Sequence, residues 1–166
     1  DNFSIRVERG TIFGFLGLRA VPGVETWDGT TYRRSLRLNH GDAVVALTPG
    51  VGAIHCTLHL DNVADVQASV QRCRRLLDLD ADPDTIEGHF ADDEILGPLV
   101  RKRPGLRSPG HPDGVELITR AVLGQQVSVK GARTLAGRLV VAVGQPLRTG
   151  VDGVTHTFPS AAAIAT

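Results

Sequence analysis

The sequence contains no methionine, only two cysteines and few aromatic side chains. These shortages limit the structural and functional classes to which the protein can belong. Because an initiator methionine is missing, we expect the chain to be part of a longer translation product. Cys56 and Cys73 are too few for a disulfide scaffold or a zinc site, and no phosphate-cradling glycine loop is present, so we predict neither a metal nor a small-molecule cofactor. No apolar run approaches the length of a membrane span, and no secretory leader opens the chain. We therefore expect a soluble, cytoplasmic monomer that has no contact with a membrane.

The formal net charge is zero, which by itself argues against a nucleic-acid-binding protein, but the charges are unevenly distributed. Residues 1–94 carry 9 basic and 15 acidic side chains, a net charge of −6, whereas residues 95–166 carry 9 and 3, a net charge of +6. A polyanion would therefore bind the second part of the chain in preference to the first. Alternatively, the basic part simply docks on the acidic part.

The first 78 residues alternate between the patterns of strands and helices. Alternating apolar and polar residues predict strands over 3–8, 24–27, 30–38, 43–48 and 54–60, and helical spacing predicts helices over 11–20 and from Asn62 to Leu77. Asp28-Gly29 is a pair that two-residue hairpin turns favour, because it adopts positive φ easily. The last helix has one apolar stripe, formed by Val63, Val66, Val70, Cys73 and Leu77. We therefore predict an α+β domain over residues 1–78, in which an antiparallel sheet packs against two helices.

Residues 79–111 have the pattern of a connector whose charge changes sign along its length. An acidic stretch comes first, and Asp82 followed by Pro83 predicts the start of a short helix within it. The later sequence RKRPGLR is basic and interrupted by proline. Such a run is either a solvated loop or a phosphate contact, and in the second case Arg103 and Arg107 are the candidate side chains.

Residues 112–166 begin with two helical runs that meet at a short polar elbow. The apolar residues at helical spacing are Val115, Ile118 and Val122 before the bend, and Val129, Ala132, Leu135, Leu139 and Val143 after it. Gly124 can end the first helix and Ser128 can cap the second. This arrangement leaves Gln125 and Gln126, two neutral amides that both donate and accept hydrogen bonds, exposed in the bend.

The second helix adds a basic flank to the elbow. Lys130 and Arg133 lie three residues apart, away from the apolar stripe, so both can meet one anion. The same residues also fit an ordinary amide-rich turn in a helical bundle. After Val143 the sequence GQPLRTGVDGVTHTF predicts a turn-rich loop, and 159–165 begins a helix that has no stop signal. We therefore interpret 112–166 as the first helices of an incomplete all-α domain.

The elbow resembles a known family. Arg120, the segment Ala121-Val122-Leu123-Gly124-Gln125-Gln126-Val127-Ser128-Val129 and the pair Ala132-Arg133 are similar to the opening helices of the DNA-3-methyladenine glycosylase II family, in the helix-hairpin-helix glycosylase superfamily. The order of elements in residues 1–78 is similar to the N-terminal domain of that family, which resembles one repeat of the TATA-binding protein fold. Pro104-Gly105-Leu106-Arg107 resembles the segment that precedes the family's helical domain.

This resemblance implies that the intact protein is a DNA repair enzyme that excises alkylated bases, of the 3-methyladenine type, from duplex DNA. In the family, the elbow enters the duplex while the damaged base is turned out. The resemblance implies that Gln126 fills the vacated space and that Gln125 lies beside the displaced base. Many family members have an apolar residue at the plugging position, so Gln126 departs from the pattern, although its amide can hydrogen-bond the orphaned partner base.

The same resemblance shows what the chain lacks. Family enzymes use a catalytic carboxylate and a glycine-rich hairpin between two helices, and neither follows the elbow here. Asp152, the only later acid, lies in a predicted loop, so we assign no catalytic residue and predict that residues 1–166 alone are inactive. Trp27 and Tyr32 fall in the predicted sheet and are expected to be core residues or members of a cross-strand pair, away from any base pocket. Some relatives are fused to an Ada-type, alkylation-sensing regulator, and the missing methionine is compatible with such a fusion.

Two other functions are open at this point. A transcriptional regulator of the alkylation response would use residues 115–143 as a helix-turn-helix, with Lys130 and Arg133 reaching into the major groove. Gly131 and Gly137 leave much of that helix bare, which argues against this interpretation. Alternatively, the acidic N-terminal sheet is a protein-interaction module whose edge strands meet a partner.

Overall fold

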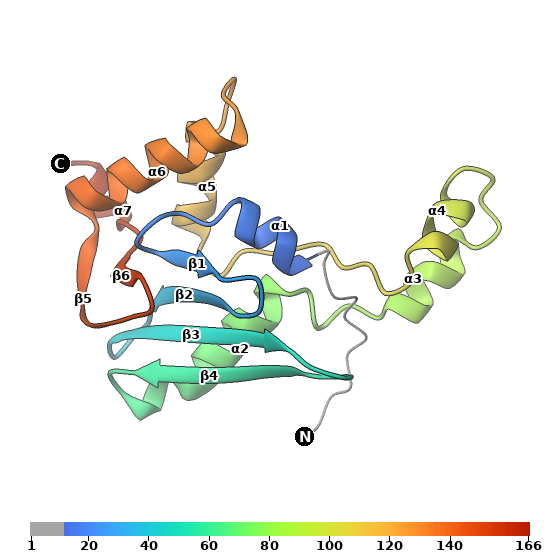
Figure 1. The fold of residues 1–166 in the computed structure, drawn as a ribbon, viewed down its shortest axis with the longest axis horizontal. Helices are drawn as coiled ribbons and strands as arrows, with labels where there is room; N and C mark the ends of the chain where they lie inside the picture. The colour runs from blue at the N-terminus through green and yellow to red at the C-terminus, as the bar shows by residue number, and fades with distance from the viewer. Residues whose placement is uncertain (1–11) are drawn as a thin grey trace.

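The computed structural model describes residues 12–166, so the strand predicted over 3–8 lies outside the described residues. In chain order the described elements are α1 (Ile12–Leu18), β1 (Glu25–Trp27), β2 (Tyr32–Arg37), β3 (Asp42–Pro49), β4 (Ile54–Leu60), the 3-10 turn η1 (Val63–Asp65), α2 (Val66–Leu76), α3 (Pro83–Phe90), α4 (Leu96–Lys102), α5 (Gly114–Leu123), α6 (Val129–Val143), β5 (Gln145–Val151), β6 (Val154–Thr157) and α7 (Ala161–Ile164). Figure 1 shows the larger sheet below α5 and α6, and α3 with α4 projecting to one side as an arm. The predicted α+β fold class is confirmed.

Strands β1 to β4 form an antiparallel sheet in chain order, as predicted. The turn between β1 and β2 is longer than the predicted two residues, because Trp27 pairs with Tyr32 and residues 28–31 lie between them. The Asp28 carboxylate accepts a hydrogen bond from the Thr30 N–H at 2.8 Å, and Gly29 has a φ of 95°. A side-chain-stabilised turn with glycine at positive φ therefore replaces the tight one.

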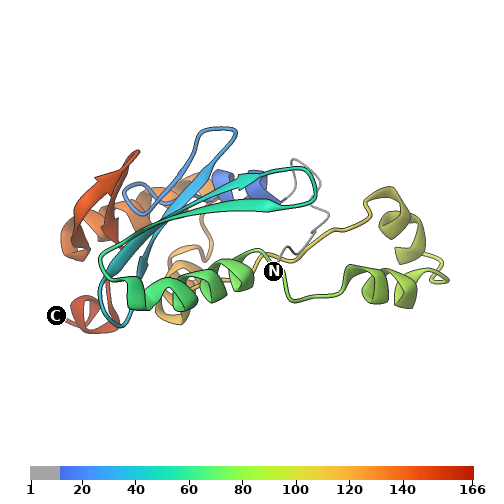
Figure 2. The ribbon, with the colours of Figure 1, turned by 90° about the horizontal axis from the view of Figure 1, so that it is seen from below.

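One face of this sheet packs against α1 and α2, and Figure 2 shows α2 lying along the sheet. The buried residues of this core are Ile12, Phe13, Leu16, Tyr32, Leu36, Ala43, Val45, Leu47, Cys73, Leu76 and Leu77. Trp27 packs against the same core and stacks on Phe13, with ring centroids 5.8 Å apart. Both aromatic residues of the predicted sheet therefore belong to the core, as expected.

The predicted apolar stripe of the helix after Asn62 is only partly correct. Val63 and Val66 are 82% and 38% exposed, while Ser69 is buried. The first turn, η1, is a 3-10 helix, so it does not continue with the angular spacing of α2 that the stripe assumed. The Ser69 hydroxyl satisfies its own burial by donating to the Asp65 carbonyl oxygen at 2.9 Å.

A two-stranded antiparallel sheet, β5 with β6, occupies the segment that we predicted to be a loop. It packs on β2, where Ser35 Oγ donates to the His156 carbonyl oxygen at 2.7 Å and Arg37 donates to Thr157 Oγ1 at 3.0 Å. Only Val154 and Thr157 are buried in these strands, so the sequence shows little of the apolar alternation that identifies a strand. Residues 112–166 are therefore not purely helical.

Helices α5 and α6 lie where the sequence predicted them, but the predicted stripes are not their buried faces. Ile118 and Val122 are 67% and 61% exposed, and the buried residue of α5 is Glu116. The buried residues of α6 are Ala136, Gly137 and Val140, which lie one or two positions after Leu135 and Leu139 of the predicted stripe. Ala136 and Val140 pack with Val21, Val24 and Phe158. The neighbouring loop before β1 therefore decides which side of α6 is covered.

The arm of α3 and α4 begins with the predicted cap. Asp82 accepts a hydrogen bond from the Asp84 N–H at 3.1 Å, and Pro83 occupies the first turn. Arg107 fastens the base of the arm by donating to the carbonyl oxygens of Asp78 and Ala81. Over residues 12–166, no helix is both long enough and apolar enough to cross a membrane.

Candidate nucleic-acid interface at the elbow between α5 and α6

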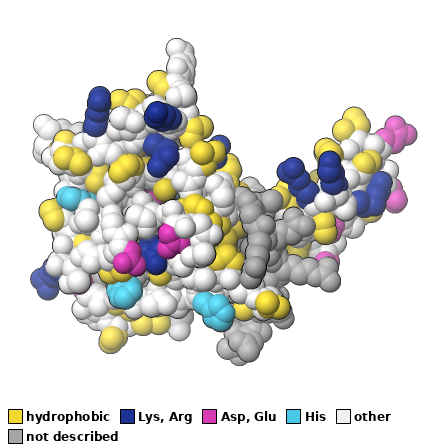
Figure 3. Space-filling model, in the orientation of Figure 1, with side chains coloured by type: hydrophobic (Ala, Val, Ile, Leu, Met, Phe, Trp, Pro, Cys, Tyr) yellow, Lys and Arg dark blue, Asp and Glu magenta, His cyan; other side chains and the backbone are white. Residues whose placement is uncertain are grey.

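The bend between α5 and α6 is built as the sequence predicted. Gly124 ends α5, and Ser128 caps α6 because its Oγ accepts a hydrogen bond from the Gly131 N–H at 3.1 Å. Gln125 and Gln126 lie between the two caps, and both are exposed. The elbow is the knob that projects at the top of Figure 3. Two neutral amides therefore stand at an outer corner of the molecule.

Gln126 has an unusual backbone conformation. Its φ is 59°, which places it in the left-handed region, whereas Gln125 does not have a positive φ. For a residue with a side chain this conformation costs about 1–2 kcal/mol. Backbone strain of this kind occurs at binding sites, where the surrounding structure imposes it. The conformation sets the direction in which the Gln126 side chain leaves the bend.

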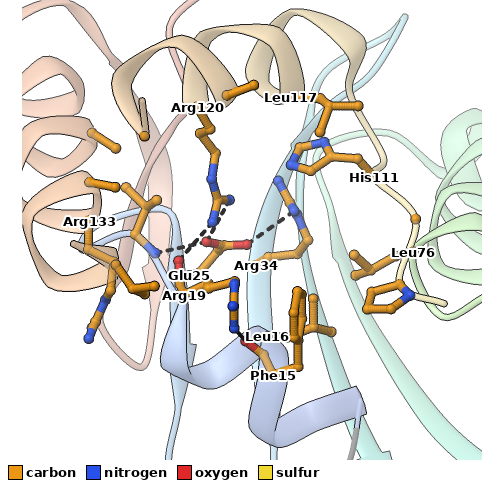
Figure 4. Close-up of a pocket in the computed structure, with 18 of the residues that line it drawn as sticks. Phe15, Leu16, Arg19, Glu25, Arg34, Leu76, His111, Leu117, Arg120 and Arg133 are labelled. Carbon is orange, nitrogen blue, oxygen red and sulfur yellow. Dashed lines mark hydrogen bonds and ion pairs between the residues drawn. The ribbon is translucent and has the colours of Figure 1, made fainter. Parts of the chain in front are cut away.

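Below the elbow, charged side chains form a buried network between the sheet and α5, and Figure 4 shows Glu25, Arg34 and Arg120 converging. Arg34 donates to Glu116 at 2.7 Å and to Glu25 at 3.3 Å. Arg120 Nη1 donates to Glu25 at 3.0 Å and to Glu116 at 2.9 Å. The Tyr32 hydroxyl also donates to Glu25. Each carboxylate meets both guanidinium groups, an arrangement that offsets the desolvation of buried charges.

These groups hold one another in their charged or donating forms. Burial alone would raise the pKa of Glu116, but the charge of Arg34 and the contact with His111 hold it well below its usual range. Burial would lower the pKa of Arg34, but the charges of Glu116 and Glu25 raise it. Burial and then the Glu25 charge raise the pKa of Tyr32, so its hydroxyl keeps its proton. Both carboxylates are fully engaged and offer no free base for catalysis.

A cavity of about 420 Å³ is bordered by this network and by the elbow. Its apolar lining includes Leu16, Leu117 and Val129. Four arginines also line it, namely Arg19, Arg34, Arg120 and Arg133 (Figure 4). Glu25 is the carboxylate in its wall, and it is already paired. The cavity is therefore a space behind the elbow without the free carboxylate that a base-excision pocket needs.

The four basic residues predicted to contact phosphate are not equally free. Lys130 and Arg103 are exposed. Arg133 donates from Nε to the Ala20 carbonyl oxygen at 2.8 Å, which leaves its two terminal nitrogens for another partner. Arg107 donates to the carbonyl oxygens at the base of the arm. The structure therefore places Lys130 and Arg133 beside the elbow, and Arg103 and Arg107 after α4.

The two parts of the chain do not pair according to their net charges. Each acid of residues 95–166 meets an arginine of the first part: Arg72 with Asp113, Arg34 with Glu116 and Arg33 with Asp152. Among the basic residues of the second part, only Arg120 forms an ion pair with an acid of the first part, within the described residues. The basic surplus therefore is not consumed by docking, and Figure 3 shows lysine and arginine side chains gathered near the elbow and on the arm.

Catalytic and metal-binding groups are scarce. Asp152 forms an ion pair with Arg33 at 2.9 Å and lies in the turn of the β5–β6 hairpin. His55 and His59 are exposed on β4. Among residues 12–166, no group of three or more side chains is placed to hold a metal ion.

Sequence reasoning missed the buried charge network. Its members come from β1, β2 and α5, and the only local spacing among them is the i,i+4 pair of Glu116 and Arg120 on α5. One signal was present: Arg34 is in phase with Tyr32 and Leu36, the inward residues of an alternating strand. An arginine at an inward position requires buried acids as partners.

Several solved structures that share this fold are DNA glycosylases. A 3-methyladenine DNA-glycosylase from Archaeoglobus fulgidus superposes with a TM-score of 0.77 and 23% identity, covering 99% of this chain and 57% of that one. A Clostridium acetobutylicum 8-oxoguanine glycosylase/lyase, in complex with double-stranded DNA, superposes with a TM-score of 0.60 and 15% identity, covering 83% of this chain and 44% of that one. The fold is therefore that of the DNA glycosylases.

Sequence relatives identify the family. Residues 7–113 match the family of the AlkA N-terminal domain, and the chain belongs to that family. A Mycobacterium tuberculosis protein named probable bifunctional transcriptional activator/DNA repair enzyme AlkA is 48% identical over 149 residues, which are 90% of this chain and 30% of that protein. The Escherichia coli DNA-3-methyladenine glycosylase 2 is 39% identical over 140 residues, 82% of this chain and 47% of that protein. The resemblance stated from the elbow is confirmed, and the chain spans less than half the length of these relatives.

Proposed function

We propose that the intact protein releases alkylated bases, of the 3-methyladenine type, from duplex DNA, and that the elbow is the part that enters the duplex. The elbow itself is the observation that carries this proposal. It presents two exposed amides, one in a left-handed conformation, on a corner flanked by Lys130 and Arg133, which make no ion pair within the described part of the chain. An enzyme reaches a glycosidic bond in duplex DNA only by unstacking the nucleotide, at a cost of a few kcal/mol. A projecting polar tip offers a partial replacement for the lost contacts.

The two glutamines have separate parts in this proposal. Gln126, whose φ of 59° turns it away from the helical path, fills the vacated space and hydrogen-bonds the orphaned partner base. Gln125 lies beside the displaced base. An amide stacks on bases less well than an apolar side chain does, but it can hydrogen-bond the edge of a base. Hydrogen bonds to the orphaned base therefore offset the weaker stacking of this elbow.

Phosphate contacts position the duplex on the elbow. Lys130 and the terminal nitrogens of Arg133 flank the bend, and Arg103 lies on the exposed end of α4, so all three can meet DNA backbone. Arg107 is less accessible than Lys130 and Arg103, because it is half-buried and its Nη1 already donates to two carbonyl oxygens.

The relatives support the glycosylase function, but no unpaired carboxylate near the elbow is available for catalysis within the described residues. We infer three functional segments, namely 1–78, the connector 79–111, and 112–166 as the start of the glycosylase domain. Since the carboxylates near the elbow are paired, the catalytic carboxylate comes from another part of the intact protein. Residues 1–166 alone bind duplex DNA weakly and release no base, and the intact protein acts as a monomer.

The experiment uses the intact protein and two duplexes, one containing 3-methyladenine and one containing a stable abasic mimic. We expect base release by the intact protein and none by residues 1–166. Changing Gln125→Ala together with Gln126→Ala should greatly weaken binding to the abasic duplex, because the space in the duplex is left unfilled. Base release that is unaffected by the double change would refute the role of the elbow.

A matched control separates the elbow from a general loss of amides. Gln67 and Gln71 are exposed on α2, and changing both to alanine removes the same atoms at another site. We expect this control to bind and cleave as the wild type does. If both double variants lose the same affinity, the effect does not come from the elbow.

The transcriptional regulator is the second candidate, favoured by the name of the Mycobacterium tuberculosis relative. As a recognition helix, α6 would have to enter the major groove. However, α6 buries Ala136 and Val140 against the loop before β1, and Arg133 is tied to that loop by the Ala20 carbonyl oxygen. Sequence-specific binding of residues 1–166 to an undamaged promoter would support the regulator, whereas preference for the abasic duplex supports the glycosylase.

A further inference from the structure

The helices on the two sides of the elbow are attached to two adjacent peptide groups, one helix to each. Arg120, near the end of α5, donates from Nη2 to the Arg19 carbonyl oxygen at 2.7 Å. Arg133, in the first turns of α6, donates from Nε to the next carbonyl oxygen, that of Ala20, at 2.8 Å. These carbonyls lie just after α1, in the N-terminal domain. The elbow is therefore supported from both sides by one short piece of backbone.

That piece of backbone is itself fixed by the buried network. Glu25 accepts a hydrogen bond from the Val21 N–H at 2.8 Å, which closes the loop that follows α1. The same carboxylate accepts from Tyr32, Arg34 and Arg120. A change in the loop therefore disturbs Arg120, and a change in Arg120 disturbs the loop. Hydrogen-bonded groups that share partners in this way are energetically coupled.

Buried polar contacts in the first half of α5, together with apolar packing of Leu123 at its end, place the helix on the domain. Glu116 is the buried residue of this helix, while Ile118 and Val122 are 67% and 61% exposed. Glu116 is 2% exposed and meets Arg34 at 2.7 Å. Charged hydrogen bonds fix orientation more strictly than apolar contacts do, because they depend on angle as well as distance. The orientation of α5, and with it that of the elbow, therefore depends on the network.

We propose that Arg120, together with Glu25 and Glu116, is a positioning residue for base extrusion, and that the N-terminal domain is the rigid support against which the elbow is pressed into the duplex. This proposal rests on the proposed function. Unstacking a base costs a few kcal/mol, and a loosely attached elbow would yield instead of opening the helix. The network makes no contact with the DNA and acts only through the elbow.

The test compares Arg120→Lys with wild type in the intact protein. A lysine can still pair with one carboxylate. Its single ammonium group cannot at the same time donate to the Arg19 carbonyl oxygen, as the planar guanidinium group of Arg120 does through its second terminal nitrogen. The substrates are two duplexes with the same alkylated base, one in its normal pair and one in a mismatch. Extrusion costs least for a mismatched base. Arg138→Lys, at an exposed position on α6, is the matched control.

We expect Arg120→Lys to slow single-turnover release of the paired base about tenfold and that of the mismatched base by about threefold or less, because only the first requires the full extrusion energy. Arg138→Lys should change neither. A purely structural role would lower both rates by the same factor, and that result overturns the proposal. Equal rates for Arg120→Lys and wild type on both duplexes also overturn it.

Two further measurements keep the outcomes separate. Wild-type protein that releases neither base refutes the proposed function, whereas active wild type with equal losses refutes only the positioning role. Arg120→Ala is a harsher change that can unfold the protein by leaving two buried carboxylates underpaired. The milder Arg120→Lys is used for this reason, and hydrogen exchange checks that its effect is local. Exchange should be about tenfold faster at Gly124 and Gln125 and unchanged in β3, which reports global stability. Faster exchange in β3 as well would mean general destabilisation and would overturn the proposal.

Discussion

Replacing Gln126 with glycine should make the elbow more stable and the protein less able to hold DNA open. The left-handed backbone of Gln126, with φ of 59°, costs a residue with a side chain about 1–2 kcal/mol, and glycine adopts it freely. Glycine also loses about 0.5–1 kcal/mol more backbone entropy on folding. The difference leaves a gain of about 0.5–1 kcal/mol for Gln126→Gly.

The effect on DNA has the opposite sign. Without its amide, position 126 can neither fill the vacated space nor hydrogen-bond the orphaned base, which corresponds to about tenfold weaker binding to an abasic duplex. Gln125→Gly is the matched comparison, because Gln125 does not have a positive φ. That change should destabilise the bend by about 0.5–1 kcal/mol.

The assay combines two measurements on the same preparations. Hydrogen exchange at the amides of residues 124–126 reports the local stability of the bend, and fluorescence anisotropy reports affinity for the abasic duplex. Gln126→Gly should slow the exchange and weaken the binding, and Gln125→Gly should speed the exchange. The reasoning is refuted if Gln126→Gly speeds exchange, or if it binds the abasic duplex as tightly as the wild type.

Three other predictions concern stability. Arg34→Met leaves Glu25 and Glu116 short of a cation in a buried site and should lower the free energy of unfolding by about 3–5 kcal/mol in urea titrations, against little change for an exposed arginine. Because the pKa of Glu116 is held below its usual 4.5, its stabilisation is fully present above that pH and is lost as the pH falls further, so the urea midpoint should drop below about pH 5, and less steeply in a Glu116→Gln variant. Ser128→Ala removes the cap bond to Gly131 and should cost about 1 kcal/mol, with Ser128→Asp restoring it.

The sequence predicted the features that depend on a few neighbouring residues. Gly124 and Ser128 end and begin helices because each satisfies backbone groups within one turn. Asp82 caps α3 for the same reason. The candidate glutamines were found because these two caps define the bend between them. Local hydrogen-bond chemistry was therefore sufficient to locate the elbow.

What lies beneath the elbow could not be predicted, because it depends on residues far apart in the chain. Arg34 and Glu116 are separated by 82 positions, and only the packing of α5 on the sheet brings them to 2.7 Å. The apolar stripe of α5 was recognised correctly as a pattern, but a pattern does not say which neighbour covers it. Here Ile118 and Val122 are exposed, and the helix faces the sheet with Glu116.

The salt dependence of DNA binding should show which cations touch phosphate. All three acids of residues 95–166 are paired with arginines of the first part, so the surface cations near the elbow are free to displace counterions from DNA. Lys130→Gln and Arg103→Gln should each reduce the slope of log affinity against log salt by about 1, measured on the abasic duplex. Arg107→Gln should change that slope little, because Arg107 is half-buried at the base of the arm, where its Nη1 donates to two carbonyl oxygens. If Arg107→Gln reduces the slope as much as Lys130→Gln does, the connector turns its basic segment toward the DNA, and the contact surface extends well beyond the elbow.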